Sequence, residues 1–300
     1  MNTKSIYFAV LAVVITLASC GGGSGSKNNI AVPAKPWVDF TIETTETHVA
    51  ETDVCPEYTI MERTQVCLSK FDLDTDGFYI LFDGTSLNGW RGYNRTDIPG
   101  RWSIDTDAET QEKTLKFSGS RQGEAQDRQG GDIIFGHKFR NFEFSIDWKV
   151  SRAGNSGIFY LAQEIKNQPI YISSPESQVL CNEHHPDARA GANRMSSSLY
   201  DMIAAIPQNA NPFGEWNNTT IIVDRGNVYH FQNGERVVSY NLWTPRWTEM
   251  LQNSKFSQEA WPLAFELLNN VGGSAREGYI GLQDHGDDVW FRDIKIKVLD

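Results

Sequence analysis

The sequence predicts an all-β protein in which two sheets pack face to face as a sandwich. The segment from Phe142 to Val150 alternates strictly, with apolar residues at even positions and polar residues at odd positions. This pattern is typical of a strand with one face in the core and one in solvent. The segments 228–232 and 236–240 flank Asn233-Gly234, a dipeptide typical of a tight hairpin turn.

Other short strand candidates are separated by turn residues, and helical patterns are few. In chain order the candidates are Phe78–Phe82, Arg101–Asp105, Thr114–Phe117, Asp132–Phe135, Phe142–Val150, Gly157–Ala162, Ser177–Leu180, Thr219–Asp224, Asn227–Gln232, Arg236–Asn241 and a final pair between Gly278 and Ile296. Between Leu242 and Leu268, the spacing of Trp247, Met250 and Leu251 predicts one short helix on the outside.

The N-terminus predicts a secretory signal peptide over residues 1–19. Lys4 precedes an apolar run, Ile6 to Leu17, that is too short for a permanent transmembrane helix. The run ends in Leu17-Ala18-Ser19-Cys20-Gly21, which resembles a bacterial lipobox. We therefore expect a lipid on Cys20, which would anchor the protein to a membrane of the cell envelope. The alternative is an ordinary cleaved signal with a chance cysteine.

The rest of the chain divides into three parts. Residues 20–36 read as a flexible tether, residues 37–77 as an N-terminal extension, and residues 78–300 as one sandwich domain. The formal net charge is −11 and Lys and Arg form no cluster, which excludes nucleic acid as an expected partner. In an oxidising compartment Cys55 and Cys67 could form a disulfide, or both could stay reduced.

Two strands present polar side chains suited to a sugar site. If residues 176–182 are extended, Glu176, Gln178 and Asn182 project from the same face, and Gln283 and His285 share a face near the final turn. A carboxylate, amides and an imidazole can bind hydroxyl groups and transfer protons. The alternative is an ordinary edge strand with solvated polar groups.

Two acidic or histidine-containing segments contain residue types that bind metal ions. Glu183-His184-His185-Pro186-Asp187 offers ligand types for zinc, but adjacent histidines in a strand face opposite ways and no helical spacing exists. The segment from Asp72 to Gly77 copies the first half of a calcium loop, with Asp83 at the twelfth position instead of Glu. Solvated loops are the favoured interpretation of both segments.

Three motifs closely resemble the family of 3-keto-disaccharide hydrolases, formerly a domain of unknown function, in a Bacteroidetes-type lipoprotein. They are Gly154-Asn155-Ser156-Gly157-Ile158-Phe159, Gly214-Glu215-Trp216-Asn217 and Gly278–Gly286, within a resemblance that runs from about Phe78 to Asp300. The resemblance implies a concanavalin A-like jelly-roll β-sandwich and a carbohydrate substrate.

The resemblance also implies a set of site residues. Glu176 and Gln178 match the Glu-x-Gln strand of the family, and Asn182 matches the motif that follows; Cys181 departs from the usual Asp. Glu215 and Trp216 belong to a segment near the sugar-binding side, where Trp216 could stack on a ring or simply be buried. Asn155 and Arg152 lie on a Gly-flanked turn that permits close approach to a ligand, and Asp132 matches another family signature.

The expected chemistry differs from that of an ordinary retaining glycosidase, which needs two carboxylates about 5 Å apart. Glu176-Ser177-Gln178-Val179 lacks the second one. In a 3-keto-glycoside the ketone acidifies the C2 proton, so a single base suffices for elimination of the aglycone. We expect Glu176 or His285 as base, with Asp132 and Arg152 in support.

Gln178, Asn155 and Gln283 are the expected sugar hydrogen-bonders. A divalent cation would fit this chemistry, although no ligand cluster is evident in the sequence. The competing hypothesis is a non-catalytic carbohydrate-binding lipoprotein, because sandwich folds serve both uses.

Overall fold

The structure, a computed structural model, describes residues 58–119 and 129–299. The expected signal peptide, Cys20, the tether and Cys55 lie outside these residues. Cys67 is a free thiol whose sulfur lies 3.0 Å from the Ser69 hydroxyl. No helix among the described residues has the length and apolar character that crossing a membrane requires.

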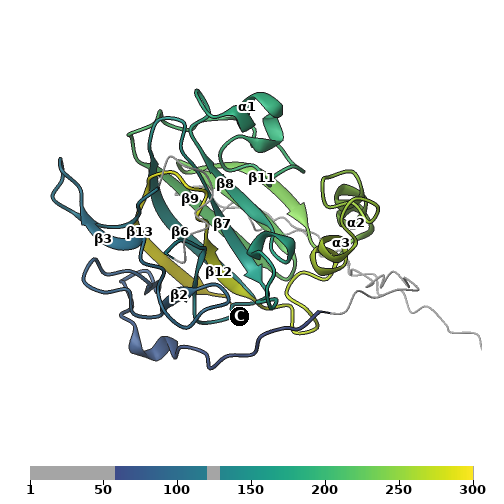
Figure 1. The fold of residues 1–300 in the computed structure, drawn as a ribbon, viewed down its shortest axis with the longest axis horizontal. Coiled ribbons are helices and arrows are strands. Elements are labelled where there is room, and N and C mark those ends of the chain that lie inside the picture. Colours follow the sequence, from purple (N-terminus) through teal and green to yellow (C-terminus); the bar gives the residue numbers. More distant parts are fainter. Residues whose placement is uncertain (1–57, 120–128, 300) are drawn as a thin grey trace, which may run out of the picture. The chain divides into compact units, whose positions relative to one another are not determined.

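The described residues form two antiparallel sheets of eight and five strands, as the sequence predicts (Figure 1). The larger sheet has the order β11-β10-β9-β6-β13-β4-β3, with β1 also pairing with β13. Its strands are β1 (Tyr79–Ile80), β3 (Trp102–Thr106), β4 (Lys113–Phe117), β6 (Phe142–Val150), β9 (Asn217–Asp224), β10 (Asn227–Gln232), β11 (Glu235–Asn241) and β13 (Val289–Val298).

The smaller sheet has the order β2-β5-β12-β7-β8. Its strands are β2 (Trp90–Gly92), β5 (Ile133–Phe135), β7 (Asn155–Ala162), β8 (Glu176–Leu180) and β12 (Tyr279–Leu282). The fold is thus the expected jelly-roll sandwich.

The core lies between the two sheets. Along β6 the even residues are buried and the odd residues are partly exposed, as the alternation predicts. Phe144 and Trp148 from this strand join Ile158 and Tyr160 of β7 in one apolar cluster. The Tyr160 hydroxyl lies 2.8 Å from Nε2 of His230 and 2.6 Å from the Tyr240 hydroxyl, so a buried polar network crosses the core.

The five-stranded sheet is buried on its outer face as well. Phe159 of β7 packs there with Tyr93, Ile134, Ile170 and Tyr279 in a second, smaller apolar cluster. Both faces of β7 and β8 are therefore covered, although β8 carries three polar residues. Buried polar groups need hydrogen-bond partners. Polar side chains without such partners on this covered face therefore mark the candidate site.

The helices lie on loops around the sandwich. α2 (Pro245–Gln252) and α3 (Pro262–Asn269) lie side by side next to β11 in Figure 1, and α1 (Pro186–Ala190) follows β8. The sequence predicts only one of the outer pair, because the segment of α3 is mostly apolar and lacks a polar face to mark its period. It also misses α1, which is too short to show a period.

Most predicted strands differ from the observed ones by one or two residues at an end. The exceptions are β2, which the sequence does not predict, and β1, where the expected Phe78–Phe82 shortens to Tyr79–Ile80. Both are too short to display alternation.

The end of the expected N-terminal extension lies against the small sheet. Arg63 and Arg91 both contact the buried Glu164 carboxylate, at 3.2 Å and 2.7 Å. Ile60 forms an isolated bridge with Ile165, and the Val66 N–H donates to the Gly136 carbonyl. The domain boundaries themselves stay a prediction.

Candidate active site

The register of the small sheet gathers four of the predicted site residues on its outer face. Gly157 pairs with Gln178, and Phe159 pairs with Glu176. The Gln283 N–H donates to the Gly157 carbonyl at 3.0 Å, so Gln283 continues β12 on the other side of Gly157. Because side chains alternate along a strand, Asn155 shares the face of Gly157. The sequence predicts the shared face of Glu176 and Gln178 correctly, whereas Asn155, expected on a turn, begins β7.

Glu176 is the buried acid of this face, with 7% of its surface exposed. Its carboxyl lies directly over Gly157: a Cβ at that position would meet Oε1 at 2.4 Å. Glycine is therefore required there by close approach. Within the described residues no hydrogen bond to the Glu176 carboxyl is formed, and burial raises its pKa to about 8. The charge of Lys255 opposes this rise, whereas Asp132 and Asp187 add to it.

Lys255 is a site residue that the sequence does not reveal. Its ammonium nitrogen lies 4.3 Å from the centre of the Tyr200 ring, and its backbone N–H donates to Asp201. Burial lowers the pKa of Lys255, against the opposing charge of Glu176. This lysine follows α2 and comes within electrostatic range of Glu176 only through the fold, so no local pattern marks it.

Three buried amide oxygens on this face have no hydrogen-bond partner within the described residues. They belong to Asn155, Gln178 and Gln283, which are 2%, 1% and 8% exposed. Unpaired buried acceptors are costly, by about 1–3 kcal/mol each. They are suited to a ligand that brings several hydroxyl donors.

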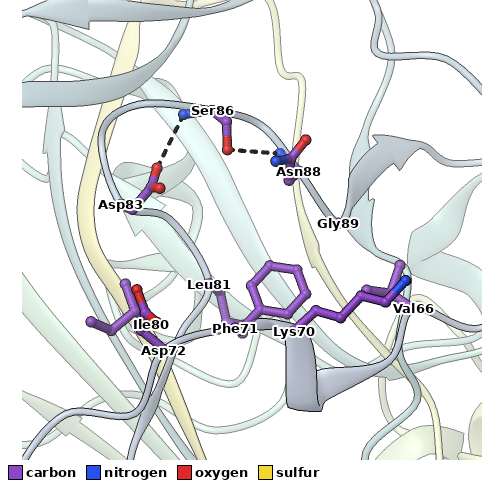
Figure 2. Close-up of a pocket in the computed structure, with 10 residues that line it drawn as sticks. All are labelled: Val66, Lys70, Phe71, Asp72, Ile80, Leu81, Asp83, Ser86, Asn88 and Gly89. Carbon is purple, nitrogen blue, oxygen red and sulfur yellow. Dashed lines mark hydrogen bonds between the residues drawn. The ribbon is translucent and has the colours of Figure 1, made fainter.

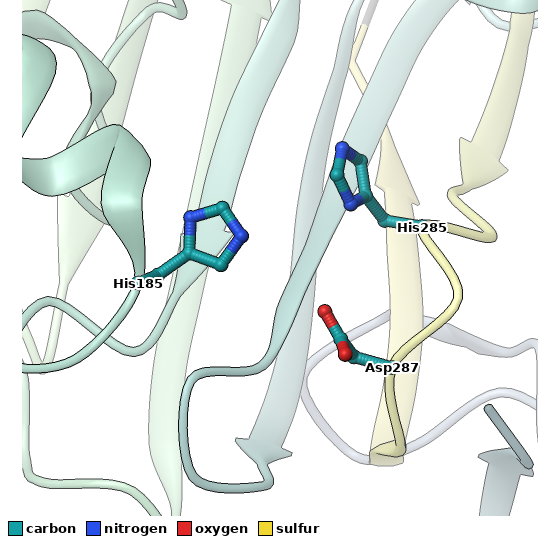
Figure 3. A group of neighbouring side chains, drawn as sticks. All are labelled: His185, His285 and Asp287. Atoms are coloured by element: carbon teal, nitrogen blue, oxygen red, sulfur yellow. The ribbon is translucent and has the colours of Figure 1, made fainter. Parts of the chain in front are cut away.

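Two histidines from distant segments meet beside Asn155. His185 precedes α1, and His285 lies in the turn between β12 and β13. The Nδ2 atom of Asn155 lies 3.4 Å from Nε2 of each imidazole. Asp287 completes the group in Figure 3, where the three side chains point toward one another.

The ligand atoms of His185, His285 and Asp287 lie within 4.8 Å of one another, so these residues could hold a metal ion. Burial lowers the pKa of His185 and raises that of Asp287, and in each case the opposite charge nearby counters the effect. His185 is the partly exposed residue before α1, in a loop as expected, but the sequence does not predict its closeness to His285 and Asp287. Its partners lie a hundred residues away in sequence, where spacing rules cannot find them.

Asp132 lies at the edge of this group. Its Oδ1 accepts the N–H of Asp284 at 2.9 Å, and Oδ2 of Asp284 accepts the N–H of Gly131. The aspartate thus fixes the turn that leads to His285. Its charge also raises the pKa of Glu176, although burial is the larger cause.

Four other predicted residues do not join the group. Arg152 lies exposed on the turn between β6 and β7, and Glu215 lies exposed before β9. Both amide atoms of Asn182 already bond Ser196, at 2.9 Å each, so this residue holds a loop.

Trp216 is on the outer face of the larger sheet, on the other side of the sandwich. Its ring contacts Arg292 at 4.2 Å and Lys149 at 4.8 Å. Lys149 alternates with the core residue Trp148, so it points away from the small sheet. Trp216 cannot stack on a sugar beside Glu176, because it lies on the opposite surface.

The remaining candidates have structural contacts. Cys181 is buried in the core between the sheets. The Asp74 carboxylate of the calcium-like segment accepts the N–H groups of Asp76 and Phe78 and pairs with Lys295 at 3.0 Å. These three donors satisfy the Asp74 carboxylate.

A separate cavity of about 280 Å³ lies between the extension and the turn after β1 (Figure 2). Phe71 and Leu81 line it. The Asp83 carboxylate accepts hydrogen bonds from the Thr85 hydroxyl and the Ser86 N–H. It shares no residue with the group around Glu176.

Comparisons with known proteins identify the family of this chain. The model of the 3-keto-alpha-glucoside-1,2-lyase-like domain matches residues 77–297. The 3-keto-disaccharide hydrolase of Bacteroides thetaiotaomicron is 58% identical over 242 residues, which cover 77% of this chain and 81% of that protein.

A solved protein of Parabacteroides distasonis ATCC 8503, described as a candidate glycosyl hydrolase, is 27% identical, with a TM-score of 0.61. The match covers 75% of this chain and 95% of that one. A second protein of that organism with the same description is 22% identical, with a TM-score of 0.47, over 71% of this chain and all of its own. On the family match and the 58% identity, the chain belongs to the 3-keto-alpha-glucoside-1,2-lyase-like family.

Proposed function

We propose that this chain cleaves 3-keto-glycosides by elimination, with Glu176 as the base that removes the proton from C2. The observation that supports it best is the Glu176 carboxyl, buried over Gly157 with a pKa of about 8 and bordered by unpaired amide oxygens. A base with a pKa near the working pH is the most effective proton acceptor. Family membership supports the substrate class.

The reaction needs one base and a way to stabilise negative charge. Glu176 takes the C2 proton, and the bonding electrons form a C2–C3 double bond while charge moves to the ketone oxygen. The ketone then re-forms, a C1–C2 double bond appears, and the C1–O bond breaks. The aglycone leaves with one proton, which balances the proton removed from C2. Water added across C1–C2 yields the 3-keto sugar.

The neighbouring residues suit this sequence of steps. Asn155, Gln178 and Gln283 offer acceptors for sugar hydroxyls. The Lys255 ammonium lies close enough to Glu176 to lower its pKa, and so increases the ionised fraction. This proposal gives the base role to Glu176 rather than His285, because the Glu176 carboxyl is the one that lies directly over Gly157 of β7.

The test uses the purified full chain with a 3-keto-glucoside and its parent glucoside, and follows release of the aglycone. We expect cleavage of the keto substrate only. The Glu176→Gln variant keeps the shape of the side chain and should lose at least a hundredfold in rate, within the range of general base catalysis. Glu183→Gln is the matched control, because Glu183 is exposed and its carboxylate lies beside His184, away from Glu176 in the sequence.

Two outcomes would contradict the proposal. Full activity in Glu176→Gln would remove Glu176 from the base role. A wild-type chain that binds both sugars but cleaves neither would favour the non-catalytic carbohydrate-binding hypothesis.

A further inference from the structure

We propose that His185, His285 and Asp287 hold a divalent transition-metal ion, and that this ion chelates the ketone oxygen and the C2 hydroxyl of the substrate. The role of the ion rests on the proposed function; the binding of the ion does not.

The geometry is close to that of a three-ligand metal centre. Ligand atoms about 2.1 Å from one ion lie about 3.0–3.4 Å from one another in octahedral or tetrahedral arrangements. The atoms of the three side chains lie within 4.8 Å of one another, so closure requires shifts of an ångström or so. All three are partly buried side chains at the ends of elements, where small rotations are available.

The donor set selects the class of ion. Two imidazoles and one carboxylate suit divalent manganese, iron, cobalt or zinc, and three protein ligands leave coordination positions open for a substrate. Within the described residues, Asp287 forms no ion pair with Lys or Arg, and its carboxylate faces the two imidazoles. An ion would supply the missing charge.

Asn155 is an independent indication that something belongs at this point. It is 2% exposed, its Oδ1 has no partner among the described residues, and its Nδ2 lies 3.4 Å from Nε2 of both histidines. The two ends of an amide have nearly the same shape. Half a turn of the amide would direct the unpaired oxygen to the space between the imidazoles, where an ion would accept it as a fourth donor.

Metal binding would also change one contact that the structure shows. Nδ1 of His185 accepts the N–H of Asp187 at 3.1 Å, which leaves the imidazole proton on Nε2. Coordination through Nε2 moves that proton to Nδ1, with no net release of protons, and ends the bond to Asp187. The Asp187 amide is in the first turn of α1, where water can replace a lost partner.

The position of the ion suits the proposed chemistry. Asn155 lies beside the histidines, and Gly157 lies beneath the Glu176 carboxyl. These two residues are two positions apart in β7, so their Cα atoms are separated by about 7 Å along the strand. In this proposal one sugar ring lies between the ion and the base. The two adjacent oxygens of an α-hydroxyketone form a five-membered chelate, and the ion would stabilise the negative charge that develops on the ketone oxygen.

The experiment strips the full chain with EDTA and then titrates it with Mn²⁺, followed by electron paramagnetic resonance, and with Co²⁺, followed by visible absorption. We expect about one ion per chain, with imidazole nitrogen among the ligands. Asp287→Asn and His185→Gln should each weaken binding at least tenfold, as expected for loss of a ligand. His184→Gln is the matched control, because this neighbour lies outside the cluster.

A structural readout guards against variants that fail to fold. Addition of a diamagnetic ion, Zn²⁺, to the stripped wild-type chain should shift the amide resonance of Asp187. Binding that is absent in the wild type, or equal in wild type and Asp287→Asn, would overturn the metal site. Metal binding without cleavage of a 3-keto-glucoside would leave the site standing and refute the proposed function. Cleavage that persists in a metal-free chain would refute the role of the ion in the reaction and leave the base role of Glu176 standing.

Discussion

Replacing Glu176 by Gln should make the free energy of unfolding less sensitive to alkali, and the size of the effect follows from burial. The pKa of Glu176 is raised from its ordinary 4.5 to about 8 by removal of the carboxyl from water. Between these two values the folded chain holds a proton that the unfolded chain has lost. The contribution of this group to stability is therefore fully present below pH 4.5, and it is lost as pH rises through 8.

The magnitude is about 1.4 kcal/mol for each pH unit between the two pKa values. At pH 7 the wild-type chain has lost about 3 kcal/mol of stability relative to pH 4.5, and above pH 8 about 5 kcal/mol. Gln has no ionised form, so its variant escapes this loss. The free energy of unfolding of the variant, relative to that of the wild type, should therefore increase by about 3 kcal/mol from pH 4.5 to pH 7. The amide can change stability by a constant amount, but this amount is the same at both pH values.

The assay is urea unfolding at pH 5, 7 and 9, followed by tryptophan fluorescence, for the wild type, Glu176→Gln and the exposed control Glu183→Gln. The control should track the wild type at every pH. A difference between wild type and Glu176→Gln that stays constant from pH 5 to 9 would show that the carboxyl titrates normally, and the reasoning about a buried base would then fail.

Four further outcomes are expected. The kcat/KM for a 3-keto-glucoside should rise with pH and level off above about 8, because Glu176 must be ionised; in Lys255→Gln, measured over the same range, the rise should move to higher pH because a stabilising charge is gone. Gly157→Ala should lower kcat at least tenfold while circular dichroism stays unchanged, since the new Cβ would displace the carboxyl. Burial lowers the pKa of His230 from 6.5 to about 4, so on acidification the unfolded chain binds a proton at this residue before the folded chain does. The wild type should therefore lose about 3 kcal/mol of stability between pH 6.5 and pH 4. Urea unfolding of His230→Gln should not show this loss. Cys20→Ala should release the protein from the membrane fraction, and unchanged partitioning would refute the expected lipid anchor.

Much of the site is predictable from the sequence because it depends on local alternation. Glu176 and Gln178 are two residues apart in one strand, and any strand places them on one face. The same rule fails for Asn182, since β8 ends at Leu180 and the chain turns before reaching it. The expectation for Trp216 comes from the family resemblance, and it fails because this residue leads into β9 of the larger sheet, away from Glu176.

The sequence by itself determines the all-β class, the core strand Phe142–Val150 and the Asn-Gly hairpin, because each depends on residues close together in the chain. Only the tertiary structure decides that His185 meets His285, that Lys255 reaches Glu176 and that the carboxyl lies over Gly157. These contacts join segments tens to a hundred residues apart, through strand register and burial. Register and burial are set by the packing of the whole sandwich, and so no local pattern contains them.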